Sequence, residues 1–327
     1  MNSKSQRILD RPNIELLSLV FPIYNEEGVI PHLEVALAEW RRDLPFNLEI
    51  IFVDDGSEDD SFSLLTAWAE RDECIRLYSF SRNFGHQSAL SAGLDFARGD
   101  AVVTLDADLQ DPLEVIFEMV NAYNSGFDIV YGIRRKRVGE SMFKRATAWF
   151  FYRFMRLFIH PDLPADAGDF RLISRRCLHV LEMMPERDRF LRGMFAWMGF
   201  PQTGVYFDRP VRTHGITKFS LIKMLGFALN GVLSFSALPI RIITLAGVFI
   251  GLMGFGYGVY VVGRWYVLGD TVKGWPSLIV LLSLIGGMIL LGLGIVGEYV
   301  SRIYEALKAR PWYILKESVH SKPLENE

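Results

Sequence analysis

AVVTLDADLQDPLE, residues 101–114, joins a run of apolar residues to a loop that carries two carboxylates spaced D-x-D. The apolar run is typical of a strand buried on both faces of a sheet. Asp106 and Asp108 follow this strand directly, so we expect them at the carboxyl edge of the sheet. Ligands of open parallel sheets bind at this edge, because strand-end loops and helix N-termini meet there. The stretch therefore predicts a binding site.

The donor atoms of this loop indicate a metal. Asp106, Asp108 and Gln110 offer only oxygen, and no Cys or His stands nearby in the sequence. Hard oxygen ligands suit Mg²⁺ or Mn²⁺ rather than Zn²⁺, and an ion held by one or two carboxylates normally takes phosphates as its other ligands. The expected substrate thus carries a diphosphate. The alternative is that this D-x-D is a solvated turn.

Strand and helix patterns alternate over residues 16–131. Apolar runs predict strands at 16–21, 48–53, 75–79, 101–105 and 128–131, and helical periodicity fits 27–42, 61–70, 87–97 and 112–124. This alternation predicts an α/β fold with a doubly wound, mostly parallel sheet. Neither G-x-G-x-x-G after the first strand nor G-x-x-x-x-G-K-[ST] occurs, so phosphates must be held by metal and cationic side chains.

Polar residues also follow the first two predicted strands. They are Pro22, Tyr24, Asn25, Glu26 and Glu27 after the first, and Asp54, Asp55, Gly56, Ser57 and Asp59 after the second. All lie on the same predicted edge as Asp106, so three loops should converge. A Tyr can stack on a base and an Asp can accept from a uracil N–H or a ribose hydroxyl, which predicts a nucleoside site. The alternative is helix capping, since Asn25 and Ser57 each precede a helix.

Hydrophobic residues make up 50% of the chain and gather toward its C-terminal part. Residues 242–263 and 274–297 contain no charge, and each is long enough to cross a hydrocarbon core of about 30 Å. Because residues 264–273 are few, these segments predict a transmembrane hairpin. Residues 224–240 are also uncharged but shorter, and predict an interfacial helix.

Charge and cysteine usage restrict the partners and the compartment. The net charge of −3 argues against nucleic acid as the main partner. Basic residues flank both predicted spans, which by the positive-inside rule places both flanks in the cytoplasm. They are Arg209, Arg212, Lys218, Lys223 and Arg241 before the first span, and Arg302, Lys308 and Arg310 after the second. Cys74 and Cys177 lack metal spacing, the N-terminus lacks a secretory signal, and the polar tail after Trp312 is expected to be loosely ordered.

Four ordered motifs resemble those of family 2 glycosyltransferases with a GT-A fold: F-P-I-Y-N-E-E, V-D-D-G-S-x-D, D-A-D-L-Q-D-P and G-D-F-R-L. Together with the predicted hairpin they are most similar to the polyprenyl-phosphate sugar transferases, the dolichol-phosphate mannose synthase-like and bacterial GtrB-like group. The resemblance covers residues 14–312. It implies a cytoplasmic catalytic domain at 1–137 and 161–217, spans at 241–264 and 274–298, and a cytoplasmic tail at 299–327.

The resemblance also implies roles for single residues. Pro22, Tyr24, Glu26 and Asp54 are similar to nucleoside-contacting positions, with Asn25 in the same loop. Asp106 would bridge nucleotide and metal, and Asp108 and Gln110 match metal-coordinating positions. Arg134, in Y-G-I-R, falls where the family places a phosphate-binding arginine. Asp169 matches the carboxylate near the reacting sugar carbon, with Asp166 as the rival.

Two segments are expected to meet the acceptor. Residues 138–160, VGESMFKRATAWFFYRFMRLFIH, predict an amphipathic interfacial helix, with an ordinary helix packed on the sheet as the alternative. By resemblance, Lys144, Arg145 and Thr147 would meet the acceptor's phosphate. Residues 209–224 resemble the family's R-x-x-G-x-S-K-Y, which Arg212, Thr217 and Lys218 fit, and the resemblance places these three at the acceptor phosphate. As a basic loop next to a membrane, Arg212, His214 and Lys218 suit anion binding, and plain positive-inside charge is the alternative. A juxtamembrane helix at 218–240 follows. Ile216 stands where many relatives have Glu, which leaves any preference carried by that position open.

The resemblance implies inverting, metal-dependent transfer of a sugar from a nucleotide sugar to polyprenyl (undecaprenyl) phosphate at the cytoplasmic face of the inner membrane, by a homotetramer. Glucose from UDP-glucose is the first expectation; N-acetylhexosamine, mannose and aminoarabinose stay open. A phosphate monoester is already ionised near neutral pH, so Asp169 is expected to orient the donor or stabilise the sugar rather than act as a base. A processive synthase would need several spans and Q-x-x-R-W, which this chain lacks. A non-catalytic scaffold or flippase subunit would be marked by a broken D-x-D.

Overall fold

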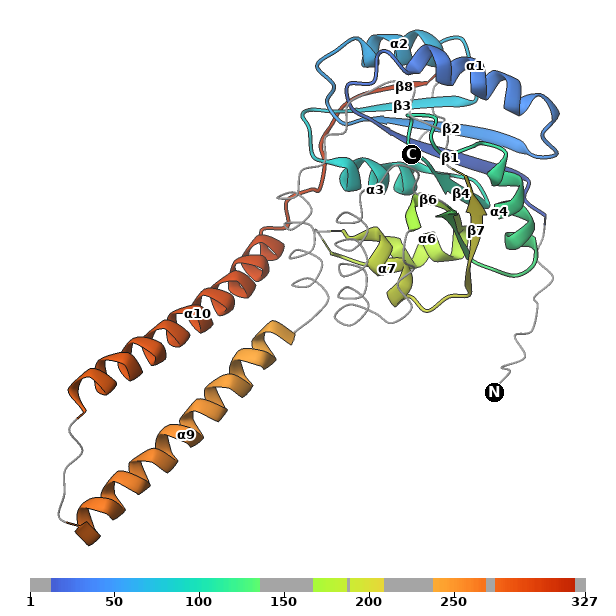
Figure 1. Cartoon of the computed structure of the whole chain (residues 1–327). Helices are drawn as coiled ribbons and strands as arrows, with labels where there is room; N and C mark the ends of the chain where they lie inside the picture. The colour runs from blue at the N-terminus through green and yellow to red at the C-terminus, as the bar shows by residue number, and fades with distance from the viewer. Residues whose placement is uncertain (1–12, 136–166, 187–188, 209–237, 269–273, 321–327) are drawn as a thin grey trace. The chain divides into compact units, whose positions relative to one another are not determined.

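The computed structural model describes residues 13–135, 167–186, 189–208, 238–268 and 274–320 (Figure 1). The chain forms two compact units, Met1–Leu225 with Pro311–Glu327, and Gly226–Arg310. The predicted interfacial helix at 138–160 and most of the one at 218–240 lie outside the described residues. So do the following predicted site residues: Lys144, Arg145, Thr147, Asp166, Arg212, Thr217 and Lys218.

Within the described residues, the first unit is built on an eight-stranded sheet in the order β7-β5-β6-β4-β1-β2-β3-β8. The strands are β1 Leu16–Ile23, β2 Asn47–Asp54, β3 Ile75–Phe80, β4 Ala101–Thr104, β5 Ile129–Arg134, β6 Ala167–Ser174, β7 Gln202–Phe207 and β8 Leu315–His320. Strands β4, β1, β2 and β3 pair in parallel, as do β5 and β7. Only β6 and β8 run antiparallel to their neighbours in this described sheet. The predicted mostly parallel α/β sheet is confirmed.

Helices connect the strands and cover both faces of the sheet. They are α1 Ile30–Trp40, α2 Ser61–Ala69, α3 His86–Phe96, α4 Val115–Asn124, α6 Arg175–Glu182 and α7 Leu191–Trp197, with a 3₁₀ turn η1 at Arg41–Asp43. Every strand and helix predicted between residues 16 and 131 is present, with ends shifted by a few residues. The regular alternation of buried apolar runs and amphipathic segments made these elements predictable.

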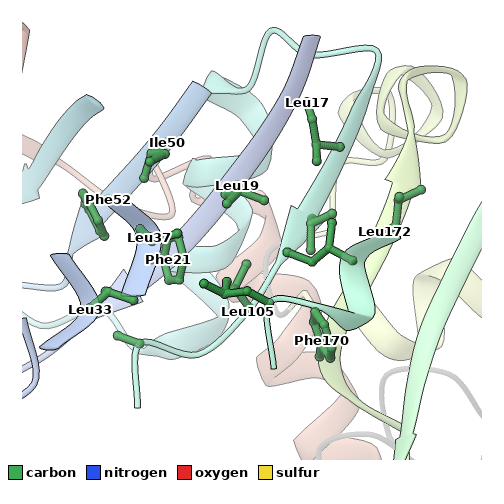
Figure 2. Packing of buried hydrophobic residues seen from close by; sticks show 14 of the residues in the cluster. Leu17, Leu19, Phe21, Leu33, Leu37, Ile50, Phe52, Leu105, Phe170 and Leu172 are labelled. Carbon is green, nitrogen blue, oxygen red and sulfur yellow. The ribbon is translucent and has the colours of Figure 1, made fainter. Parts of the chain in front are cut away.

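The core explains why the strand sequences are almost continuously apolar. Leu19 and Phe21 of β1 face α1 and pack beside Phe52 of β2, whose ring centroid lies 5.3 Å from that of Phe21 (Figure 2). The opposite face of β1 meets α3, where a Cβ on Gly93 would lie 2.2 Å from Val20 Cγ1. Because helices cover both faces of β1, side chains that point to either face are buried, and apolar residues are favoured at nearly every position of the strand.

Strand β6 was not predicted, and it determines the position of Asp169. It lies between β4 and β5, antiparallel to both, with Thr104 opposite Arg171. Phe170 and Leu172 alternate into the core from this strand. The alternation was readable in the sequence, but its place between two parallel strands was not. Asp169 thereby comes to lie beside the end of β4 that leads into the D-x-D loop.

The expectation of a loosely ordered tail after Trp312 is wrong for residues 315–320. They form β8, which pairs with β3 at the edge of the sheet. Just before the strand, the ring of Tyr313 stacks on that of Phe80 with centroids 4.9 Å apart. Strand β8 could not be predicted from the sequence, because LKESVH is mostly exposed and carries no buried apolar face.

The second unit consists, in its described part, of α9 Leu238–Leu268 and α10 Trp275–Leu307. Ile243–Tyr260 and Ile285–Leu307 are long and apolar enough to cross a membrane, with mean hydropathies of 1.6 and 1.3. The helices approach closely at Gly292, where a Cβ would lie 3.3 Å from Ile243 Cγ2. Helix α9 begins at Leu238, so it includes the last residues of the segment for which a separate interfacial helix was expected.

Candidate active site

Three loops leave the sheet at the same edge, as the sequence predicted. Strands β4, β1 and β2 are adjacent and parallel, so the loops that follow them begin side by side. Pro22 is buried near the end of β1, and Tyr24, Asn25 and Glu26 are half-buried just beyond it.

The first two loops are tied together by hydrogen bonds. Asn25 N donates to Ser57 Oγ over 3.0 Å, and Glu58 N donates to Asn25 Oδ1 over 2.8 Å. The helices that follow begin after Val29 and Asp60, neither of which makes a side-chain capping bond. Asn25 and Ser57 therefore do not cap α1 and α2, and the capping alternative is wrong. Their polar groups fix one loop against the other.

Asp54 ends β2 and is 1% exposed. Its Oδ1 accepts from Ser57 N over 3.0 Å, and its Oδ2 accepts from Ser79 Oγ over 2.7 Å. Asp54 therefore holds the turn after β2 against β3. A contact with a nucleoside, which would use its remaining lone pairs, stays a prediction.

Asp55 has a structural role that the sequence reading did not assign. Its carboxylate accepts from the backbone of Phe84 over 2.6 Å and of Gly85 over 2.9 Å, and so fixes the start of α3. Burial raises the pKa of Asp55, and these two donors oppose the rise. Gly56 allows the segment before α3 to come close to this turn, because it has no side chain and its φ is +67°. A Cβ at this position would lie 2.5 Å from the carbonyl carbon of Arg82.

The D-x-D loop is compact. Leu109 has a φ of +55°, and Gln110 N donates to Asp108 Oδ1 over 3.1 Å. Asp106 is 38% exposed at its side chain, Asp108 is half-buried and Gln110 is buried. Partial burial raises the pKa of Asp106, as do the charges of Asp169 and Asp108, against the lowering effect of His86. A carboxylate crowded by other carboxylates is stabilised in its charged form by a cation.

The donor set fits a metal that is completed by its substrate. Among the described residues, no group of three or more His, Cys, Asp and Glu side chains could hold a metal ion. The loop offers two carboxylates, Asp106 and Asp108, beside the buried amide of Gln110. These three side chains are too few to supply all the ligands of a metal ion. Mg²⁺ and Mn²⁺ sites of this kind take the remaining ligands from phosphate oxygens and water.

Asp169 lies at the centre of a cluster drawn from three other elements. Arg192 of α7 donates to it twice, from Nε to Oδ1 over 2.8 Å and from Nη2 to Oδ2 over 2.9 Å. From α3, His86 Nε2 lies 3.4 Å from Asp169 Oδ2, and Gln87 Nε2 lies 3.5 Å from the same oxygen. Thr104, at the end of β4, donates its hydroxyl to the backbone carbonyl of Asp169.

His86 joins this cluster to the D-x-D loop, since its Nε2 also lies 3.8 Å from Asp106 Oδ1. No His stands near the acidic loop along the sequence, but in the folded chain His86 lies beside it, so the expected absence of a nearby His is wrong. Burial would lower the pKa of His86, but Asp169 and Asp106 together raise it. Burial would raise the pKa of Asp169, but Arg192 and His86 hold it well below its usual value.

Arg134 ends β5 on the same side of the sheet. Its Nη2 lies 3.4 Å from the place of a Cβ on Gly168, next to Asp169, and its charge lowers the pKa of Asp106. Its Nε is buried and has no hydrogen-bond partner in the part of the chain that the structure describes. The guanidinium is thus placed beside the acidic cluster with donor capacity for an anion.

These groups make a site with two kinds of carboxylate. Asp106 and Asp108 lie in the D-x-D loop, where a cation would offset their charges, whereas the charge of Asp169 is already offset by the guanidinium of Arg192. An anionic ligand with a metal counter-ion can bind at the first pair, with Arg134 as a further cation. His86 and Arg192 were missed from sequence because each is a single residue in a segment without a motif.

Comparison with known proteins shows which family this chain resembles. The model of the family described as Glycosyl transferase family 2 matches residues 18–181. An uncharacterized glycosyltransferase of Synechocystis is 43% identical over 92% of this chain and 95% of its own. A bactoprenol glucosyl transferase of Shigella phage SfII is 40% identical over 94% of this chain and 99% of its own.

Among solved structures, the glucosyl-3-phosphoglycerate synthase from Mycobacterium tuberculosis in complex with Mn²⁺, UDP-glucose and phosphoglyceric acid is 20% identical. It matches over 67% of this chain and 78% of its own, with a TM-score of 0.46.

Proposed function

The chain belongs to glycosyltransferase family 2, and from this we propose that it transfers glucose from UDP-glucose to a polyprenyl phosphate at a membrane surface. The observation that carries the proposal is the 40% identity, over nearly the whole of both chains, to a protein named bactoprenol glucosyl transferase. The intact D-x-D and two apolar helices are what such a reaction needs.

Donor binding is assigned to the three converging loops. Tyr24 and its neighbours Pro22, Asn25, Glu26 and Asp54 would contact the nucleoside. Asp106 and Asp108, with Gln110, would hold Mg²⁺ or Mn²⁺, which when bound neutralises the diphosphate and stabilises charge on the leaving group. Arg134 would contact a donor phosphate, because its guanidinium lies beside the carboxylates and retains a free donor among the described groups.

Asp169 is assigned to the sugar rather than to proton transfer. Its carboxylate is held ionised and takes two bonds from Arg192, so it is a weak base. The acceptor phosphate is itself ionised near neutral pH and needs no strong base. Asp169 would therefore orient the donor and stabilise positive charge on the sugar ring. Direct attack by the acceptor oxygen would invert the anomeric carbon.

The acceptor explains why the chain carries apolar helices. A polyprenyl tail stays in the bilayer because each buried CH₂ contributes about 0.8 kcal/mol. We propose that α9 and α10 form a transmembrane hairpin in the inner membrane, with the catalytic domain and both termini in the cytoplasm, and that the chain assembles as a homotetramer. The cationic and hydroxyl residues proposed for the acceptor phosphate are Lys144, Arg145, Thr147, Arg212, Thr217 and Lys218.

The test is to incubate membranes containing the full chain with Mg²⁺ and a panel of radiolabelled sugar nucleotides, and then to extract the lipid. Label from UDP-glucose in the lipid fraction is expected. Label from another donor would correct the sugar while keeping the reaction. If no donor labels the lipid, the transferase proposal fails and a non-catalytic scaffold takes its place.

A further inference from the structure

We propose that Arg192 is a positioning residue, which holds the carboxylate of Asp169 in one orientation toward the donor sugar. The inference rests on the proposed function, since it assigns Asp169 to the sugar. It adds a residue from an element, α7, that carries none of the four motifs.

The contact is a two-point one. Nε and Nη2 of Arg192 bind one oxygen each of Asp169, at 2.8 and 2.9 Å. A planar guanidinium that binds both oxygens of a carboxylate fixes its rotation as well as its distance. The side chains are 26% and 13% exposed, so the pair is only partly screened by solvent. Arg192 thus restrains the side-chain torsions of Asp169, which the strand backbone leaves open.

Other contacts fix the backbone on both sides of the Arg192–Asp169 pair. The backbone of Asp169 is fixed to the end of β4 by the hydroxyl of Thr104. On the other side, Leu191 N donates to Gln87 Oε1 over 3.4 Å, which ties the start of α7 to α3. Arg192 therefore reaches Asp169 from an element that is itself attached to the site. This is the arrangement required when a group must be held to within a fraction of an ångström.

Pairing Asp169 also separates the roles of the three carboxylates. If Asp169 were unpaired, its negative charge would add to those of Asp106 and Asp108, and all three would compete for one cation and repel the diphosphate. With Arg192 in place, the charge of Asp169 is compensated inside the protein. The metal is then assigned to Asp106 and Asp108 alone.

A direct contact between Arg192 and a donor phosphate is the competing role. Two of its nitrogens are already engaged by Asp169, whereas Arg134 keeps a buried Nε without a partner among the described residues. The two roles predict different kinetics. Loss of a phosphate ligand raises KM for the donor, whereas loss of orientation at the sugar lowers kcat.

The experiment measures kcat and KM for UDP-glucose with the full chain in membranes, for Arg192→Met, Asp169→Asn and the double variant. Arg192→Met should lower kcat about 100-fold with KM changed less than about 3-fold. The double variant should be no slower than Asp169→Asn alone, because the two residues act as a unit. Arg176→Met is the matched control, since Arg176 makes a similar two-point pair with Asp128 from α6. Its kcat should stay at the wild-type value.

Arg192→Lys extends the test in case the Met variant fails to fold. It keeps the charge but cannot bind both oxygens in one plane, so kcat should still fall about 10-fold. Unchanged kcat in Arg192→Lys, multiplied losses in the double variant, or a rise confined to KM would each overturn the inference. An inactive wild-type chain would instead refute the proposed function.

Discussion

Gly56 shows how a single residue in a motif serves the geometry of the site. Its φ of +67° suits glycine, and a side chain there would meet the backbone of Arg82 and Asn83. The motif V-D-D-G-S thus needs glycine so that the segment before α3 can approach and be bound by Asp55.

Gly56→Ala should lower the free energy of unfolding by about 2–4 kcal/mol, from unfavourable φ and from the close contact. Thermal unfolding of the detergent-purified chain measures this as a lower Tm. Gly28→Ala is the control, because nothing lies within 4 Å of a Cβ at that position. Equal Tm values for the two variants would contradict the role given to Gly56.

His86 should make stability depend on pH. The carboxylates around it raise its pKa above the usual 6.5, so the folded chain binds the proton more tightly than the unfolded chain. This contribution is fully present below about pH 6.5 and is lost as the pH rises through the raised value. The Tm difference between the wild type and His86→Gln should therefore be largest near pH 6 and shrink toward about pH 9. A difference that does not vary with pH would show that His86 is not protonated in the folded chain.

The sequence predicted some site residues and not others for a clear reason. Asp54 ends a buried strand and Asp106 and Asp108 come just after one, so the sheet itself fixes their place. His86 and Arg192 reach the site from α3 and α7. Both are far from Asp169 along the chain, so no sequence motif indicates that they lie beside it. Only the packing of these helices shows that a histidine borders the acidic loop and that an arginine compensates one carboxylate.

At the scale of elements, the returning C-terminal segment attaches to the catalytic sheet by aromatic packing as well as by β8. Tyr313 stacks on Phe80 and meets the edge of Phe96, and burial raises its pKa to about 12. Arg189 lies over the ring of Trp312, with its guanidinium carbon 3.2 Å from the centroid.

Tyr313→Ala should lower the free energy of unfolding by about 2 kcal/mol, less than for a fully buried ring because Tyr313 is half-buried. Thermal unfolding again provides the measurement. Lys316→Ala, an exposed position in β8, should leave Tm within the error of the wild type. If Tyr313→Ala behaves like Lys316→Ala, the segment is not a stabilising part of the sheet.

Elements differ in how far they can be read from sequence. The parallel strands carry apolar runs that mark burial on two faces, and they were predicted. Strand β8 has one neighbour and an exposed surface, so its stability comes from pairing with β3 and from Tyr313 beside it. Strand β6 has the apolar pattern, but only the folded sheet shows that it enters between β4 and β5.

At the scale of the whole molecule, the proposed topology places the connection between α9 and α10 on the side of the membrane opposite to the catalytic domain. Thr271→Cys, in a Cys74→Ser background, should react in intact cells with a maleimide that does not cross the membrane. Lys316→Cys should react only after the cells are permeabilised. The remaining native thiol, Cys177, is buried and should stay unlabelled. Labelling of both positions from outside would contradict the hairpin.

The central claim is that carboxylates after β4 hold a cation on which sugar transfer to a membrane lipid depends. The most direct test measures radiolabelled glucose in extracted lipid for the wild type, Asp108→Ala and Glu114→Ala, each with Mg²⁺ or with a chelator. Wild type and Glu114→Ala, which changes an exposed residue nearby, should label the lipid only with the metal. Asp108→Ala should lose at least about 100-fold while keeping its Tm. Undiminished transfer by Asp108→Ala, or full transfer with the chelator, would contradict the account.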